Sequence, residues 1–152
     1  MRRLYRLIIA LLFSMFCFYT AAFSAQDLSK ADREAALKAA GFSFRGTQAI
    51  NECDEIADIK LTAIDLNGDG RLEVFVQDSS GMCYGVAGGS LILLIKDSKG
   101  NWKKNLDFPA VGYKLLSTKH KGYPDIEIGV PGPCCPIWRW NGKEYELYKK
   151  AR

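Results

Sequence analysis

Short apolar runs separated by turn residues fill the chain from Ile59 onward. The breaks between them are rich in Gly, Asn and Asp, which favour tight turns. Short runs at this spacing, with Asn-Gly turns, are typical of antiparallel sheets. The pattern predicts strands at Ile59–Ile64, Leu72–Gln77, Ser90–Lys96, Trp102–Leu106, Tyr113–Ser117, Asp125–Val130, Ile137–Trp140 and Glu144–Tyr148.

One helix is predicted ahead of this β region, at Leu28–Ala40. Asp27 or Ser29 can cap its start, and Gly41 supplies the left-handed residue that ends it. Its thin stripe of small apolar residues is suited to packing on a sheet. The segment 42–56 is mixed in character and is expected to be loop and irregular strand.

The fold class predicted from these elements is mainly β, with antiparallel, blade-like sheets and one N-terminal helix. A shift of 52 residues superposes Gly70 on Gly122, and the run after Glu73 on the run after Asp125. A period near 50 residues is typical of propeller blades. Two blade-like units and a small sandwich are both compatible with the pattern.

The N-terminus has the features of a secretory signal. A basic stretch precedes the apolar run Leu7–Phe18, and small residues follow, with Ala22 and Ser24 suited to cleavage before Ala25. The expected domains are therefore a signal peptide, 1–24, and one β domain, 25–152, in the periplasm or secreted, with no membrane span after cleavage. A permanent N-terminal anchor is the alternative.

Charge excludes one class of partner. Cleavage removes three arginines and no acidic residue, which leaves 128 residues with a formal net charge of +1. No basic stripe with interleaved aromatic residues is present, so nucleic-acid binding is not expected.

Four cysteines remain in the expected mature chain: Cys53, Cys83, Cys134 and Cys135. An even number in an exported chain favours disulfides. Zinc is less suited, because the chain has no CxxC pair and one histidine. Three connectivities are possible. The corresponding places of Cys83 and Cys134 after their strands favour a Cys83–Cys134 bond, with Cys53 paired to Cys135 or free.

The stretch from Asp65 to Glu73 carries the clearest chemistry. Oxygen-bearing side chains alternate with glycines, a spacing that suits Ca²⁺. The EF-hand pattern fails, because its twelfth position is Val76 and a strand follows. The expected metal residues are Asp65, Asn67, Asp69, Arg71 (through its carbonyl) and Glu73. A weak, structural calcium loop and a metal-free Asx turn both remain open.

This motif and the strand after it resemble the repeat of FG-GAP/VCBS-type proteins, whose propeller blades hold Ca²⁺ in this loop. The chain is similar in particular to small exported proteins with one such motif. The supporting stretches are 35–42, 83–85 and the PDI-x-IG and WRWNGK segments within 122–145. Cys135 departs from that pattern, which has a bulky apolar residue there. The resemblance implies a fold and a metal loop, not an activity.

Two further features bear on function. Trp138 and Trp140 lie on the same face of one predicted strand. Their rings are expected either to pack in the core or to form a binding platform. The acidic residues Asp125, Glu127, Glu144 and Glu146 are expected on the solvent-exposed faces of strands, although two of them could act as the carboxylate pair of a glycosidase.

The function expected is a non-enzymatic binding module for an unknown envelope protein or glycan, including an inhibitor or immunity protein. The alternative is an envelope carbohydrate hydrolase.

Overall fold

The computed structural model describes residues 27–132 and 135–150. The expected signal peptide, 1–24, and Cys134 lie outside these residues. The elements in chain order are α2 (Lys30–Ala40), β1 (Ser43–Arg45), β2 (Gln48–Ile50), β3 (Ile59–Ile64), β4 (Glu73–Asp78), α3 (Gly81–Tyr84), η1 (Gly85–Ala87), β5 (Ser90–Lys96), β6 (Trp102–Pro109), β7 (Gly112–His120), β8 (Tyr123–Gly129), β9 (Ile137–Trp140) and β10 (Tyr145–Lys149).

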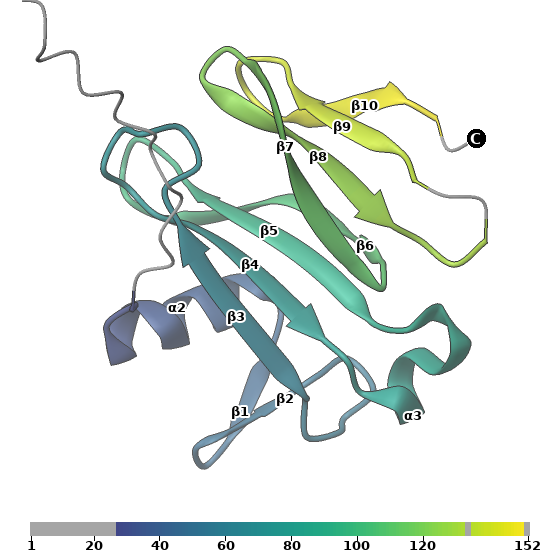
Figure 1. The fold of residues 1–152 in the computed structure, drawn as a ribbon. Coiled ribbons are helices and arrows are strands. Elements are labelled where there is room, and N and C mark those ends of the chain that lie inside the picture. Colours follow the sequence, from purple (N-terminus) through teal and green to yellow (C-terminus); the bar gives the residue numbers. More distant parts are fainter. Residues whose placement is uncertain (1–26, 133–134, 151–152) are drawn as a thin grey trace, which may run out of the picture.

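The protein is mainly β and antiparallel, as the sequence predicts. Two four-stranded sheets each follow the chain from strand to neighbouring strand, β3-β4-β5-β6 in the first and β7-β8-β9-β10 in the second. Figure 1 shows the second sheet beside one face of the first, with α2 on the other side of the first sheet. The result is three layers, in which the first sheet is the middle one.

The middle position of the first sheet explains why its two central strands, β4 and β5, are buried on both faces. Along β5, Leu91 and Leu93 face the second sheet, whereas Ile92 and Leu94 face α2. Successive strand residues point to opposite faces, so a strand covered on both sides needs a continuous apolar run. The sequence run Leu91–Ile95 has this property.

The second sheet contributes an aromatic half to the core between the sheets. Tyr123, Trp140 and Tyr145 contact one another there, with ring centroids 4.4–6.1 Å apart. Ile126 and Ile128 of β8 are fully buried beside them. Burial of these side chains between the sheets supplies the main apolar stabilisation of the second sheet.

The helix begins two residues later than the sequence predicts. Ser29 is its N-cap and accepts the backbone N–H of Asp32, and Gly41 ends it with φ of +107°. The segment expected to be irregular instead forms a hairpin of β1 and β2, a separate two-stranded sheet. Across the described parts of the chain, 27–132 and 135–150, no helix has the length and apolar character to cross a membrane.

Candidate functional site

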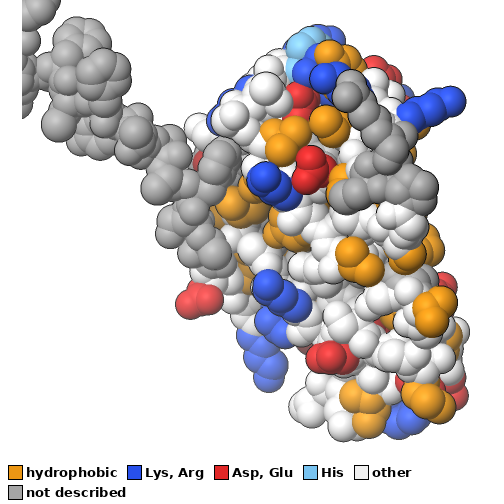
Figure 2. All heavy atoms as spheres, turned by 45° about the vertical axis from the view of Figure 1, so that its right-hand side comes forward, with side chains coloured by type: hydrophobic (Ala, Val, Ile, Leu, Met, Phe, Trp, Pro, Cys, Tyr) orange, Lys and Arg blue, Asp and Glu red, His pale blue; other side chains and the backbone are white. Residues whose placement is uncertain are grey.

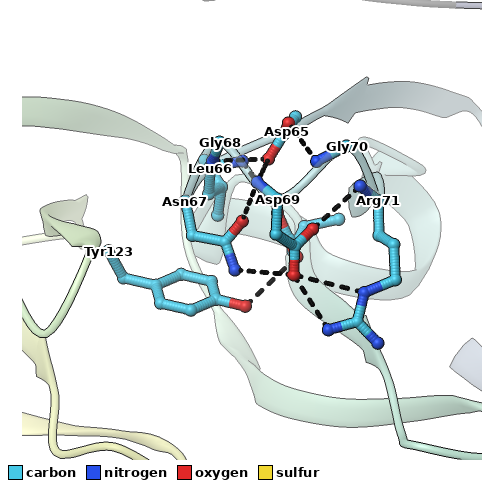
Figure 3. Close-up of polar contacts among 9 residues, drawn as sticks. Asp65, Leu66, Asn67, Gly68, Asp69, Gly70, Arg71 and Tyr123 are labelled. Atoms are coloured by element: carbon cyan, nitrogen blue, oxygen red, sulfur yellow. Dashed lines mark hydrogen bonds and ion pairs between the residues drawn. The ribbon is translucent and has the colours of Figure 1, made fainter.

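The predicted metal motif forms the connection between β3 and β4 (Figure 3). The carboxylate of Asp65 organises it: Oδ1 accepts the backbone N–H of Gly68 at 2.7 Å and of Asp69 at 3.2 Å, and Oδ2 accepts that of Gly70 at 2.8 Å. Gly68 and Gly70 both have φ of +82°, which glycine adopts at little cost. The loop therefore closes around one acidic side chain.

Asp69 faces the cation of the same loop. Its Oδ2 accepts Arg71 Nη2 at 2.8 Å and Asn67 Nδ2 at 3.1 Å, and its Oδ1 accepts the Arg71 backbone N–H at 2.8 Å. The Arg71 guanidinium lowers the pKa of Asp69. The Arg71 side chain is 61% exposed, so this ion pair contributes at most about 1 kcal/mol.

Glu73 is held by uncharged donors. Its side chain accepts the Leu66 backbone N–H at 2.8 Å and the Tyr123 hydroxyl at 3.2 Å. Glu73 is 2% exposed. Burial is the main cause that raises the pKa of Glu73 to about 7. Because Tyr123 begins β8, this carboxyl connects the motif loop to the second sheet.

These donors have the chemistry that Ca²⁺ prefers, but they are arranged as a hydrogen-bonded turn. Asp69 is engaged by Arg71, and Glu73 by Leu66 and Tyr123. Within 27–132 and 135–150, no group of three or more His, Cys, Asp or Glu side chains is placed to hold a metal. A bound ion would be held by Asp65, Asn67, Asp69, the Arg71 carbonyl and Glu73, and would compete with Arg71 for Asp69 and with Leu66 and Tyr123 for Glu73. Calcium binding stays a prediction.

The tryptophan pair belongs to the core. Trp140 is 9% exposed, and Trp138 packs against the same cluster with its ring 5.2 Å from that of Phe108. Both side chains lie on the face of β9 that packs against the first sheet, since Trp140 belongs to the core cluster between the sheets and Trp138 packs against it. The structure thus places Trp140 in the core, and Trp138, which is partly buried, at its edge; a binding role for the pair stays a prediction.

The favoured cysteine pairing is wrong. Cys53 bonds Cys83, with their Cα atoms 5.7 Å apart. The prediction assumed that Cys83 and Cys134 lie close together because each follows a strand at a corresponding place in its unit. Those strands belong to different sheets, so corresponding positions need not be neighbours. Cys135 is also disulfide-bonded.

A buried aspartate beside the disulfide was not found by sequence reasoning. Asp78, 1% exposed, accepts Asn51 Nδ2 at 3.1 Å and the backbone N–H groups of Asp58 and Ser80 at 3.0 and 3.1 Å. It thereby connects the segment 51–58 to the start of the β4–β5 loop. The Asp-Ser-Ser sequence after a predicted strand was the available signal, because such residues bond nearby backbone.

The expected exposure of Asp125 is also wrong. Asp125 is 2% exposed and accepts Arg139 Nη2 and the Thr118 hydroxyl, each at 2.7 Å. Asp125 alternates with core-facing Ile126 and so lies on the outer face of the sheet, where the Arg139 side chain covers it and itself packs on the Tyr148 ring. Arg139 lowers the pKa of Asp125, which makes it a poor general acid. Glu144 and Glu146 are exposed, as expected.

The chain matches no protein-family model, and neither a curated protein nor a solved structure is significantly similar to it. The similarity to FG-GAP/VCBS-type repeats therefore stays a prediction that rests on the sequence motif and on the segments 35–42, 83–85 and 122–145.

Proposed function

We propose that this protein is a non-enzymatic binding module of the periplasm or the secreted space, and that it binds a protein through its β4–β5 loop. The observation that carries the proposal is the apolar tip of this loop. Met82 is 89% exposed and Val86 fully exposed, on the short helical turns α3 and η1. Val111, 58% exposed, contacts Gly88 beside them. Met82, Val86 and Val111 are the apolar loop surface.

A disulfide and a buried aspartate fix the position of the loop that carries the apolar loop surface. The Cys53–Cys83 bond fixes α3 to the segment 51–58, and buried Asp78 bonds both segments. Figure 2, which brings this end of the molecule forward, shows apolar side chains at several places over its lower half. A preorganised apolar surface loses little conformational entropy on binding, which favours its use as an interface.

A protein partner suits this surface better than a glycan. Glycan platforms use exposed aromatic rings, whereas Trp138 and Trp140 pack in the core. Met and Val side chains contact apolar protein surfaces, and Met adapts to irregular ones. The signal-like N-terminus and the disulfide favour an oxidising compartment. The motif loop then has a structural role, with or without Ca²⁺.

The test is recovery of a partner from an envelope extract of the producing cells. The wild-type protein should retain a defined partner, and Met82→Ser with Val86→Ser should reduce its recovery at least tenfold. Leu147→Ser, at an exposed apolar residue of β10, is the matched control and should retain the partner. Equal recovery by all three proteins, or release of sugars from envelope glycan by the pure protein, would contradict the proposal.

A further inference from the structure

A groove of about 520 Å³ lies between α2 and the β1–β2 hairpin, away from the apolar loop surface. Leu37 of α2 and Phe44 of β1 line it, together with Ala49, Ala57 and Ile59. All five belong to the apolar cluster between α2 and the first sheet. Figure 1 shows the hairpin below α2, projecting beyond the first sheet. Its volume is within the range of small-molecule sites.

The rim of this groove is positively charged. Lys30 and Arg33 of α2 line it and are exposed. Neither side chain has an ion pair or hydrogen bond with another described residue, whereas Lys38 pairs with Glu34 at 2.7 Å. Glu34, the acidic residue that lines the groove, pairs with Lys38 and also lies in the field of Lys30. Lys30, Arg33 and Glu34 together still leave the rim with a net positive charge, which favours an anion beside the apolar floor.

We propose that this groove binds a small amphipathic anion, a carboxylate or sulfonate carried on an apolar chain. The apolar body would lie along Leu37, Phe44 and Ile59, and the anionic group would meet Lys30 and Arg33. Burial of the apolar body supplies affinity, and the two cations select the charge of the head group. The site is independent of the proposed protein interface, because it lies on α2 and the hairpin.

The test is titration of the protein, as isolated from producing cells, with dodecanoate below its critical micelle concentration. Calorimetry should show one saturable site, and dodecyltrimethylammonium should bind at least tenfold more weakly. Lys30→Glu with Arg33→Glu should weaken dodecanoate at least tenfold and favour the ammonium compound. Both positions are exposed and lie in the first turns of α2, where acidic residues favour the helix dipole, so the variant should fold.

Two controls separate the site from general effects. Lys99→Glu with Lys143→Glu makes the same charge change at exposed residues elsewhere and should leave dodecanoate binding within twofold of wild type. Ala49→Trp, which fills the groove, should abolish binding of both compounds. Equal binding of both head groups, or equal affinities in all variants, would overturn the proposal. A dimer that forms through Phe44 without any dodecanoate binding would also overturn it, and would assign the groove to a second copy.

Discussion

The first sheet joins its first two strands, β3 and β4, through the eight residues 65–72, whereas the second joins β7 and β8 through Lys121 and Gly122 alone. Both sheets otherwise follow the same strand order. Lys121 and Gly122 have φ of +49° and +90°, the left-handed pair of a tight hairpin turn. A long loop is therefore not required to build such a sheet. The motif loop is an elaboration of the first sheet.

The second strand of each sheet also begins or nearly begins with a buried carboxyl, Glu73 in β4 and Asp125 in β8, and the two are stabilised differently. Glu73 accepts hydrogen bonds from Leu66 and Tyr123, which are uncharged, whereas Asp125 is paired with Arg139. Burial raises the pKa of Glu73 to about 7, but the Arg139 guanidinium lowers the pKa of Asp125. The two carboxyls are both 2% exposed, yet desolvation dominates at Glu73 and the Arg139 hydrogen bond dominates at Asp125, so their pKa values shift in opposite directions.

The largest loss of stability is expected from replacing Arg139, the charge partner of Asp125 in the second sheet. Arg139→Met leaves Asp125, 2% exposed, without its charge partner and should lower the free energy of unfolding by about 3 kcal/mol, the low end for a buried pair, because Arg139 is partly exposed and the Thr118 hydrogen bond remains. Urea denaturation checks this. Arg71→Met removes the partner of exposed Asp69 and should change stability by less than about 1 kcal/mol. Similar losses in the two variants would contradict the argument from burial.

A pH dependence should follow from the other carboxyl. Between its ordinary pKa of 4.5 and about 7, folded Glu73 keeps a proton that the unfolded chain has released. Stability should therefore fall as pH rises through this window, by about 3 kcal/mol. Thermal unfolding in chelator from pH 5 to 8 measures it.

Glu73→Gln is the control for this pH dependence. The amide oxygen keeps an acceptor for Leu66 and cannot titrate, so its melting temperature should vary much less over the same range. Asp125 acts in the opposite direction, because its pKa is lowered and its contribution is lost as the pH falls below about 4. A wild-type protein that becomes more stable from pH 5 to 8 would show that Glu73 is ionised in the fold.

The elements of the fold differ in how well the sequence pattern predicted them. β3, β5 and β9 have the predicted bounds, because turn-forming residues flank their apolar runs: Asp on both sides of β3, Gly and Asp around β5, and Pro and Asn around β9. The end of the helix at Gly41 was predictable for the same reason, because a residue next to the helix determines it. The β1–β2 hairpin was missed because each strand has three residues, too few for a period.

The candidate site was predictable in part. The alternating oxygens and glycines identify a loop that turns on Asp65, and local sequence is enough for that. The contact between Glu73 and Tyr123 was not predictable, because 50 residues separate the two and sheet packing brings them together. The burial of Asp125 and the Cys53–Cys83 bond likewise depend on tertiary structure, not on strand alternation or on repeat spacing.

Calcium should stabilise the protein through the motif loop of the first sheet, and substitutions in the second sheet should not change this effect. If the motif loop binds Ca²⁺ in the folded state alone, a concentration of about 100 Kd should stabilise the protein by about 2.7 kcal/mol, and raise Tm by several degrees. Asp69→Ala should abolish the shift. Asp125→Asn, in the second sheet, should lower Tm and retain the calcium shift. Identical melting curves in millimolar calcium and in chelator would leave a metal-free Asx turn.

The smallest effect is expected at the tight turn itself. Gly122 has φ of +90°, and the atom nearest to an added Cβ, Asn67 Cβ, is 3.9 Å away. Space is therefore sufficient, and the cost of Gly122→Ala should come from the backbone conformation, at about 1 kcal/mol. Gly122→Asn should cost less, because Asn tolerates left-handed conformations better. Urea midpoints of the two variants provide the measurement. Equal midpoints would mean that the turn relaxes, and that the second sheet tolerates a looser connection as the first does.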